Sequence, residues 1–276
     1  MTGAILEFQA VHYRYPDGSK GLDDCTLMIA EGERTAILGA NGAGKTTLLL
    51  HTNGLLRPQQ GEVRYDDRLL SYRRAELIRL RTDIGMVFQN PDSQLFSASV
   101  REDVAFGPLN LGLSADEVGH RVDRALAAVH LNDCAHKPVQ HLSFGQKKRV
   151  CLAGVLAMHP RVLILDEPMA GLDPAMQREF LSLLDELHAS GLSVLLATHD
   201  LDFAYQWSDT MVIMDAGKCV ARIATDTLSA QQEVLTRFGL GIPQVMQVWN
   251  ALGSAEDTPP RSVEDLCRYI VDNGYK

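Results

Sequence analysis

The stretch GANGAGKT, at residues 39–46, constrains this chain most, because it fits the pattern G-x-x-x-x-G-K-[ST] of phosphate-binding loops. An apolar segment, residues 35–38, precedes it and a helical pattern, residues 45–53, follows, so the loop joins a strand to a helix. Its glycines let backbone N–H groups curl around a phosphate where a side chain would obstruct. The motif predicts a nucleoside triphosphate site formed by Gly39, Ala40, Asn41, Gly42, Ala43, Gly44, Lys45 and Thr46.

Charged and hydroxyl side chains near the phosphates have predictable tasks. Lys45 supplies a positive charge to the β- and γ-phosphates, and Thr46 offers its hydroxyl to Mg²⁺. A second apolar run, residues 162–165, ends in Asp166 and Glu167. A buried parallel strand places such residues near the phosphates, so we expect Asp166 to hold Mg²⁺ and Glu167 to polarise the attacking water. The alternative, an exposed acidic turn, is less favoured in a chain that carries the phosphate-binding loop.

Polar residues also end two further predicted strands. Gln89 follows residues 84–88, and His199 comes shortly after residues 193–197. The Gln89 side chain is expected to reach the metal or the attacking water. A neutral imidazole at His199 can donate a hydrogen bond to the γ-phosphate. Either residue alone is typical of a solvated strand end, so the expectation rests on their order along the chain.

Short apolar strands alternate with helical patterns along the chain. This alternation predicts an α/β fold with a mostly parallel sheet and helices on both of its faces. Residues 5–15 and 25–29 add two strands before the loop, and residues 215–218 mark a hairpin turn. Beyond the hairpin we expect two or three short helices, with a linker at residues 253–260.

Residues 90–140 have a different pattern and are predicted to be wholly helical. Ser99 is followed by Glu102, and Ser114 by Glu117, and each pair is a capping-box start. The apolar side chains of this block either form a groove for a partner or pack its own core, and the sequence leaves both open. The candidates for such a groove are Leu95, Phe96 and Val100.

The stretch LSFGQ, at residues 142–146, also has two interpretations. Ser143 as an N-cap and Gln146 three positions later form a capping box before an apolar run. The stretch therefore begins a well-capped core helix. Helix N-termini also attract anions, so the same residues are candidates for contact with a phosphate.

Composition excludes several classes of protein. The formal net charge of −9 and the pI of about 5.4 argue against general nucleic-acid binding, which depends on neutralising phosphates. The N-terminal residues show no basic region followed by an apolar run, and no apolar stretch approaches the ~20 residues of a membrane span. Five scattered cysteines without a CxxC pair predict reduced, mostly buried thiols. We expect a soluble protein that reaches a membrane only through a partner.

Taken in order, these motifs make residues 4–225 similar to an ATP-binding-cassette (ABC) ATPase. GANGAGKT is followed by Gln89 of the Q-loop, LSFGQ as the signature motif, VLILDE, GLD as the D-loop with Asp173, and His199 as the switch histidine. The resemblance implies a P-loop NTPase fold with a RecA-like core, an antiparallel β subdomain and a helical subdomain at about residues 90–140. It places the ATPase domain at residues 1–225 and a helical appendage at 226–276. It also assigns Tyr15 to stack on adenine and Thr47 to the ATP-binding residues.

A narrower resemblance covers other stretches of the chain. YRYPDG near the N-terminus, QNPDSQLFSASVREDVAFGPLNLGL, LSFGQKKR and FGLGIPQVMQVWNAL look like ATPases of energy-coupling-factor importers. Among these they are most similar to cobalt and nickel importers, with cobalt favoured. Many ABC ATPases have glycine where Phe144 stands, so this residue points to the subgroup.

The resemblance also implies a working unit and partners. Two copies form a head-to-tail homodimer, in which the signature of one closes over ATP held by the other and contributes Leu142, Ser143, Phe144, Gly145 and Gln146. The implied cofactors are ATP and Mg²⁺, with Thr46, Gln89 and Asp166 as Mg²⁺ ligands. The implied partners are a transmembrane coupling protein and a substrate-binding component, at the cytoplasmic face of the inner membrane.

Alternatives remain in the same fold and outside it. An ABC ATPase for vitamin uptake carries the same motifs, because the ATPase does not touch the cargo. An ABC protein that works on nucleic acid is less favoured in this acidic chain. A small-molecule P-loop kinase has no signature motif.

Overall fold

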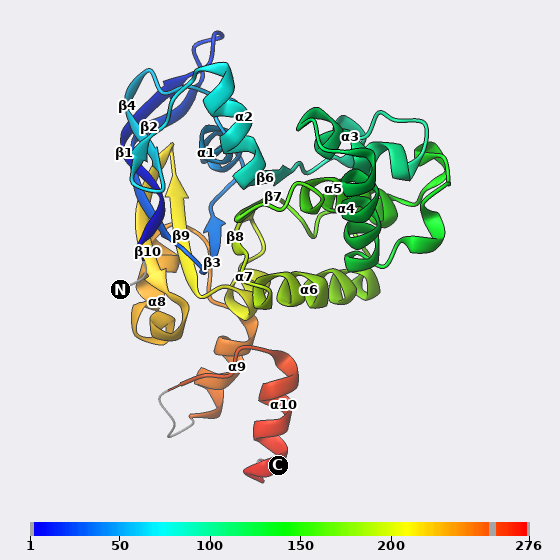
Figure 1. Cartoon of the computed structure of the whole chain (residues 1–276). Coiled ribbons are helices and arrows are strands. Elements are labelled where there is room, and N and C mark those ends of the chain that lie inside the picture. The colour runs from blue at the N-terminus through cyan, green and yellow to red at the C-terminus, as the bar shows by residue number, and fades with distance from the viewer. Residues whose placement is uncertain (1–2, 254–257, 275–276) are drawn as a thin grey trace. The chain divides into compact units, whose positions relative to one another are not determined.

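The computed structural model describes residues 3–253 and 258–274 and is shown in Figure 1. Its contacts divide the chain into two compact units. The helical unit comprises Leu49–Arg57 and Leu70–Leu196. The β unit comprises Gly3–Leu48, Pro58–Leu69 and Ala197–Lys276. The predicted domain boundary at residue 225 stays a prediction.

The β unit contains a four-stranded antiparallel sheet with the order β2-β1-β4-β5. Figure 1 shows β1, β2 and β4 side by side. Burial along β2 roughly alternates, as expected for a strand with one face on the core. This sheet confirms the predicted antiparallel β layer. Its strands are β1 (Ala4–Arg14), β2 (Lys20–Ala30), β4 (Gln60–Tyr65) and β5 (Arg68–Leu69).

Three more strands of the β unit include the one that leads into the phosphate-binding loop. β3 (Arg34–Leu38) pairs in parallel with β9 (Thr210–Asp215), and β9 pairs antiparallel with β10 (Lys218–Ala224). Ala216 and Gly217 connect β9 to β10 with positive φ angles of 47° and 83°, which confirms the predicted hairpin turn. Because β3 is buried from Thr35 onward, it fixes the start of the loop.

The C-terminal part of the β unit is mainly helical. It comprises α7 (Leu201–Trp207), the 3₁₀ helix η4 (Thr225–Gln231), α8 (Gln232–Arg237), α9 (Gln244–Leu252) and α10 (Val263–Asp272). Helices α8, α9 and α10 confirm the predicted short helices. Val245 and Trp249 of α9 pack with Leu266 of α10 in a small apolar cluster of their own. Part of the predicted linker, residues 254–257, lies outside the described residues.

The helical unit has three buried strands. β7 (Val162–Asp166) lies between β6 (Ile84–Val87) and β8 (Ser193–Thr198), whose first four residues belong to this unit. β6 and β7 run parallel, and every residue of β7 is buried. Helix α6 (Pro174–Ala189) and α2 (Arg74–Asp83) also belong to this unit, and α2 follows no pattern that we predicted. Helix α1 (Lys45–Thr52) begins in the β unit and ends in the helical unit.

The remaining helices of this unit confirm the predicted helical block. They are η1 (Pro91–Ser93), α3 (Val100–Asn110), α4 (Ala115–Ala128), η2 (Asn132–Cys134) and η3 (Val139–His141), and α5 (Phe144–Leu156) follows the block as the separately predicted helix. Ser99 forms a complete capping box with Glu102, and the Ser114 side chain accepts a hydrogen bond from the Glu117 amide. Val100 is fully buried, so it packs the core of the block and is not a groove residue.

Within the described residues, no helix combines the length and the apolar character that a bilayer span requires. Cys25, Cys134 and Cys151 are buried, as predicted, whereas Cys219 is partly exposed and Cys267 is exposed.

Candidate ATP-binding and hydrolysis site

The predicted site residues occur in both units, and each set is described within its own unit. In the β unit, the phosphate-binding loop leaves β3 at Gly39 and enters α1 at Lys45. A Cβ atom at Gly39 would lie 2.4 Å from the Met214 carbonyl oxygen, and one at Gly44 would lie 2.5 Å from the Gly21 carbonyl oxygen. Both glycines are therefore required by close backbone approach. The loop tip, Ala40 to Gly42, is exposed.

Lys45 is buried, with 7% of its surface exposed. Its Nζ donates to the carbonyl oxygens of Gly39 at 2.7 Å and Ala40 at 3.2 Å, so the ammonium lies inside the curl of the loop. Thr46 follows it at the start of α1 and is exposed. The loop therefore encloses one positive charge, and the predicted roles of Lys45 toward phosphate and of Thr46 toward Mg²⁺ stay predictions.

Tyr15 lies in the same unit, partly buried. Its hydroxyl is 3.0 Å from the Thr47 hydroxyl, and its ring meets Tyr13 edge to face at 5.1 Å between centroids. Thr47 is buried, so its hydroxyl serves to join Tyr15 to α1. The adenine-stacking role of Tyr15 stays a prediction. His199 follows β8 in the β unit and is exposed.

In the helical unit, Asp166 and Glu167 end β7 and are 6% and 9% exposed. Glu167 has a φ of +47°, a left-handed conformation that costs free energy in residues other than glycine. In this conformation the Glu167 side chain leaves the backbone in a different direction from the side chain of a regular strand residue. The turn must therefore be held by neighbouring groups.

Lys148 of α5 holds this turn, and our sequence reasoning missed it. Its Nζ donates to the carbonyl oxygens of Glu167 at 3.2 Å, Pro168 at 2.6 Å and Ala170 at 2.7 Å. The side chain is 1% exposed, and burial lowers the pKa of Lys148 to about 8. The sequence signal for this role was a lysine on the apolar face of the predicted helix. A charge buried there requires several hydrogen-bond acceptors.

We expect Lys148→Met to lower ATP turnover roughly tenfold to 100-fold with little change in ATP affinity, because Glu167 loses its support and misplacement by about 1 Å is costly. The matching variant is Lys147→Met, since Lys147 forms its ion pair with Asp92 instead. A steady-state ATPase assay measures the difference. An equal loss in both variants contradicts the positioning role.

The wild-type chain should also show a pH effect through this lysine. With a pKa of about 8, Lys148 loses its proton as the pH rises through that value. The neutral amine keeps two donors for three carbonyl oxygens, so turnover should decline above about pH 8. In Lys148→Met this part of the pH profile should be absent.

The LSFGQ stretch begins α5 as predicted. Ser143 is the N-cap, and the Gln146 amide donates to its Oγ at 3.3 Å while Gln146 Oε1 accepts from the Ser143 amide at 3.0 Å. Ser143 is exposed, Gly145 is buried, and the adjacent Leu142 is 7% exposed. The capping box therefore leaves the N-terminal end of α5 accessible at Ser143.

Phe144 joins the signature to the D-loop within this unit. A Cβ atom at Gly171 would lie 2.7 Å from the Phe144 ring, and Gly171 has a φ of +75°. The ring also lies 5.4 Å from Lys148 Nζ. Asp173 caps α6 by accepting from the amides of Ala175 and Met176, each at 2.9 Å. The structure thus brings the signature, the Glu167 turn and the D-loop together.

The Q-loop residue Gln89 is exposed just after β6. Sequence reasoning missed Gln94, whose amide group bridges the Phe88 N–H at 3.2 Å and the Met86 carbonyl oxygen at 3.3 Å. Gln94 therefore holds the base of the Q-loop. No local pattern marks it, because its partners lie in the preceding strand.

The oxygen donors at these positions fit Mg²⁺. Thr46 offers a hydroxyl, Asp166 a carboxylate and Gln89 an amide oxygen, and Mg²⁺ prefers hard oxygen ligands. No cluster of three or more His, Cys, Asp or Glu side chains suited to a metal occurs in the part of the chain that the structure describes. The Mg²⁺ roles of Thr46, Gln89 and Asp166 stay predictions.

Comparison with known proteins agrees with this geometry. The family described as "ABC transporter" matches residues 22–170. The energy-coupling factor transporter ATP-binding protein EcfA of Methanocaldococcus jannaschii is 42% identical over 255 residues, covering 92% of this chain and 91% of that protein. The structure of cbiO1 from Clostridium perfringens, part of the ABC transporter complex cbiONQ, is 42% identical with a TM-score of 0.77. It covers 90% of this chain and 99% of that one.

A dimeric structure of the ATP-binding cassette MJ0796, bound to ADP and Pi in a post-hydrolysis state, is 27% identical. Its TM-score is 0.73, and the match covers 80% of this chain and 98% of that one. The chain therefore belongs to the ABC transporter family and is an ATP-binding, ATP-hydrolysing subunit. Within that family it is of the energy-coupling-factor type. The predicted P-loop NTPase fold is confirmed.

Proposed function

We propose that this ATPase powers the uptake of a transition-metal ion through membrane partner subunits, with cobalt favoured and nickel next. The supporting observation is the 42% identity with cbiO1 of the cbiONQ complex across nearly the whole of that chain. The sequence stretches around Gln89, Phe144 and residues 238–252 support the same subgroup. The protein acts as a peripheral subunit on the cytoplasmic face of the membrane.

In the proposed reaction, Lys45 and the loop amides bind the β- and γ-phosphates of ATP. Thr46, Asp166 and Gln89 would hold Mg²⁺, and the ion would supply positive charge for the phosphate oxygens. Glu167 accepts a proton from the water that attacks the γ-phosphate, and His199 donates a hydrogen bond to that phosphate.

Two copies are proposed to act head to tail, because each chain carries one phosphate-binding loop and one signature. Ser143 and the first amides of α5 contact the γ-phosphate held by the partner copy. Hydrolysis removes that contact, and the dimer opens. The dimeric cassette MJ0796 with ADP and Pi supports this arrangement.

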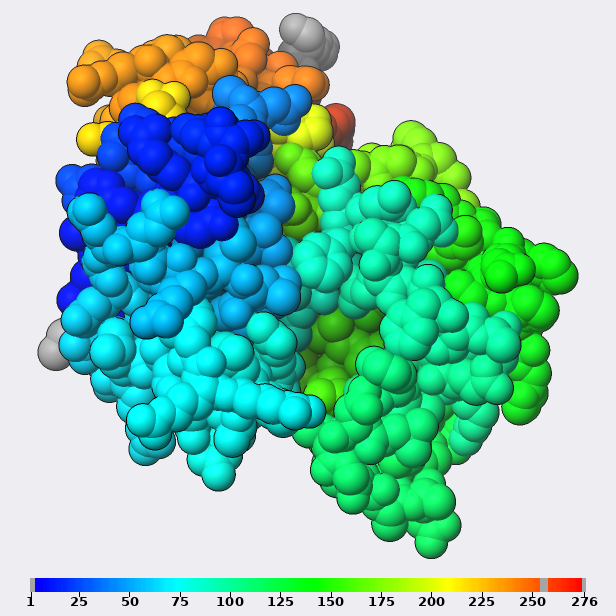
Figure 2. Space-filling view, turned by 90° about the horizontal axis from the view of Figure 1, so that it is seen from above, coloured from blue at the N-terminus to red at the C-terminus, as the bar shows by residue number. Residues whose placement is uncertain are grey.

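The helical unit offers a surface for the membrane partner. A groove of about 320 Å³ is lined by residues of α2, α3, α5 and the Q-loop region, among them Arg81, Phe96 and Met158. Figure 2 shows this hollow, with cyan atoms on one side, teal-green atoms on the other and green atoms on its floor. Phe96 is 65% exposed and stacks edge to face on Phe106. We propose that an apolar helix of the coupling protein docks here.

We expect Phe96→Asp to reduce recovery of the chain with its membrane subunits at least about tenfold, because a buried interface charge costs several kcal/mol. ATP hydrolysis by the isolated chain should be unchanged. Leu69→Asp, which is similarly exposed at 56% but lies on β5, is the matched control. Equal recovery of both variants from membranes contradicts this docking surface.

The proposed function as a whole is tested by purifying the chain from membranes with its subunits and measuring metal uptake by the complex. Cobalt uptake that requires ATP supports the proposal, and vitamin uptake without metal uptake selects the vitamin importer instead. Stimulation of hydrolysis by DNA or RNA supports the nucleic-acid alternative. Transfer of labelled γ-phosphate to an acceptor other than water indicates a kinase.

A further inference from the structure

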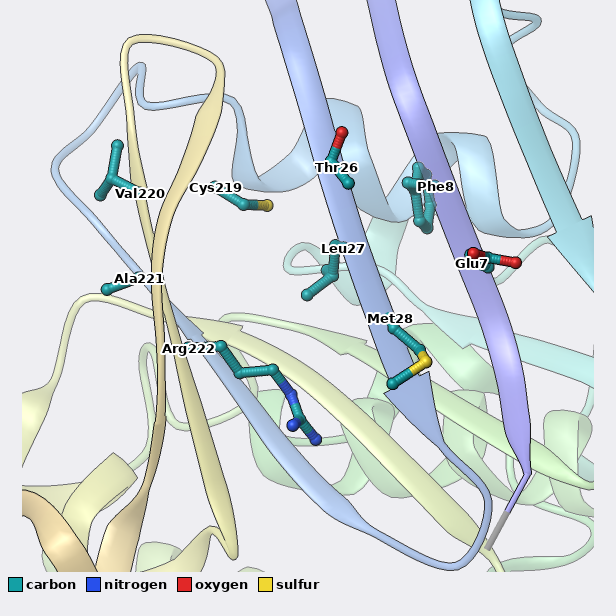
Figure 3. Close-up of a pocket in the computed structure, with 9 residues that line it drawn as sticks. All are labelled: Glu7, Phe8, Thr26, Leu27, Met28, Cys219, Val220, Ala221 and Arg222. Carbon is teal, nitrogen blue, oxygen red and sulfur yellow. The ribbon is translucent and has the colours of Figure 1, made fainter. Parts of the chain in front are cut away.

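Two cysteines far apart in the sequence face each other in the β unit. Cys25 on β2 and Cys219 on β10 are 194 positions apart, and their Sγ atoms lie 3.2 Å from one another. Cys25 is buried, whereas Cys219 is partly exposed. Figure 3 shows the Cys219 sulfur directed from β10 toward β2.

Their strands are already joined beside this pair. The Asp23 N–H donates to the Gly217 carbonyl oxygen at 2.9 Å, and Lys218 Nζ lies 3.8 Å from Asp23 Oδ2. β2 is the end strand of the four-stranded sheet, and β10 has only β9 as its neighbour in its own sheet. The backbone therefore holds the two thiols together at the place where two sheet edges meet.

A cavity gives small molecules access to the partly exposed thiol of Cys219. It has a volume of about 280 Å³ and is lined by Cys219 together with Phe8, Leu27 and Val220, among others. Figure 3 shows Leu27 of β2 and Cys219 of β10 directed into the space between these two strands. Cys25 is not among the lining residues, so an oxidant meets Cys219 first.

We propose that Cys25 and Cys219 are a reversible redox modification site, which hydrogen peroxide or another small hydroperoxide converts to a disulfide. The Cys219 sulfur attacks the peroxide, the O–O bond breaks, and a sulfenic acid and one water form. The Cys25 sulfur then attacks the sulfenic sulfur, the S–O bond breaks, and a second water leaves. The two thiols lose two electrons and two protons, and the peroxide is reduced to two waters.

The protonation of the Cys219 thiol determines how readily it reacts with a peroxide. The hydrogen bond with Cys25, together with burial, raises the pKa of Cys219. The thiolate is the reactive species, so the pair stays reduced until the oxidant is abundant or persistent. The site is therefore suited to sustained oxidative stress.

The disulfide would join two segments that both contact the phosphate-binding loop through residues just before the cysteines, Gly21 and Gly217. The Gly217 N–H donates to the Ala43 carbonyl oxygen at 2.9 Å, and a Cβ at Gly44 would lie 2.5 Å from the Gly21 oxygen and 3.3 Å from Gly217 Cα. Bond formation shortens the sulfur separation from 3.2 Å to about 2 Å, which draws β2 and β10 toward each other. The loop packs closely against the backbone of both segments, so it has no room to adjust. We expect ATP affinity to fall about threefold or more, since the loop is no longer preorganised. This consequence rests on the assignment of the loop as the ATP site.

The test uses the full chain carrying Cys267→Ser, which removes the exposed thiol. The protein is treated with hydrogen peroxide, remaining thiols are alkylated, and digested peptides are identified by mass spectrometry. We expect a Cys25–Cys219 cross-linked peptide, the loss of two reactive thiols, and recovery of both with dithiothreitol. Cys219→Ser and, separately, Cys25→Ala should each abolish the cross-link. If either variant folds poorly, the cross-linked peptide from the chain that keeps both cysteines still decides the test.

Oxidation of Cys219 to sulfinic acid without a cross-link overturns the proposal, as does survival of both thiols. Calorimetry with ATP on the reduced and oxidised protein tests the consequence. A cross-link with unchanged ATP affinity overturns the link to the loop. Failure of the reduced protein to bind ATP overturns the loop assignment instead and leaves the cross-link result standing.

Discussion

Glu167→Gln should bind ATP normally, hydrolyse it at least about 100-fold more slowly, and accumulate as an ATP-dependent dimer, because a general base contributes about that factor or more. The amide keeps the size of the carboxylate but cannot accept the proton of the attacking water. The Glu167 side chain is almost fully buried just after β7, so a base from the solvent cannot take its place. Steady-state hydrolysis and size-exclusion chromatography with ATP measure the two effects.

The control for this variant is Glu186→Gln, an exposed position on α6 that should retain wild-type turnover. The Lys148 hydrogen bond to Glu167 involves the backbone carbonyl, so it should survive the substitution. Normal hydrolysis by Glu167→Gln would remove this residue as the base. Loss of ATP binding would instead indicate that the turn after β7 had collapsed.

Lys45→Ala should lose ATP binding in calorimetry, with affinity at least about 100-fold weaker, since hydrogen bonds to charged groups contribute about 1.5–3 kcal/mol each. The substitution removes the ammonium that lies inside the loop against the carbonyl oxygens of Gly39 and Ala40. It therefore removes both the charge for phosphate and an internal support of the loop.

Lys137→Ala, at an exposed position of the helical unit, is the control for charge alone and should bind ATP as the wild type does. Comparing thermal unfolding of Lys45→Ala with that of the wild type separates lost phosphate contact from a disordered loop. Retained micromolar affinity in Lys45→Ala would contradict the phosphate-binding assignment.

Local patterns predicted much of the fold, because they depend on neighbours within one turn or strand. The capping boxes at Ser99 and Ser143 formed as predicted. The strand–loop–helix around residues 39–46 also formed as predicted. Helix α2 was not predicted, since its N-cap, Arg73, makes no side-chain capping bond and its face carries few apolar residues.

The site was predictable only for residues that belong to a motif. Lys148 acts through carbonyl oxygens 19 to 22 positions away, so its role depends on tertiary packing that no short window reveals. Phe144 was expected to mark the subgroup, and its contact with Gly171 emerged only from the fold. Val100 was grouped with Phe96 as a groove residue, but the first turn of α3 buries it.

The apolar cluster between α9 and α10 gives the protein an optical probe of its own. The chain has two tryptophans. Trp207 is buried beside Phe203 and Arg34, and Trp249 lies 4.5 Å from the Tyr269 ring, between centroids. In a Trp207→Phe chain, tryptophan emission therefore comes from the C-terminal cluster alone. Its tryptophan fluorescence would report any change in the packing of α9 on α10 without an added dye.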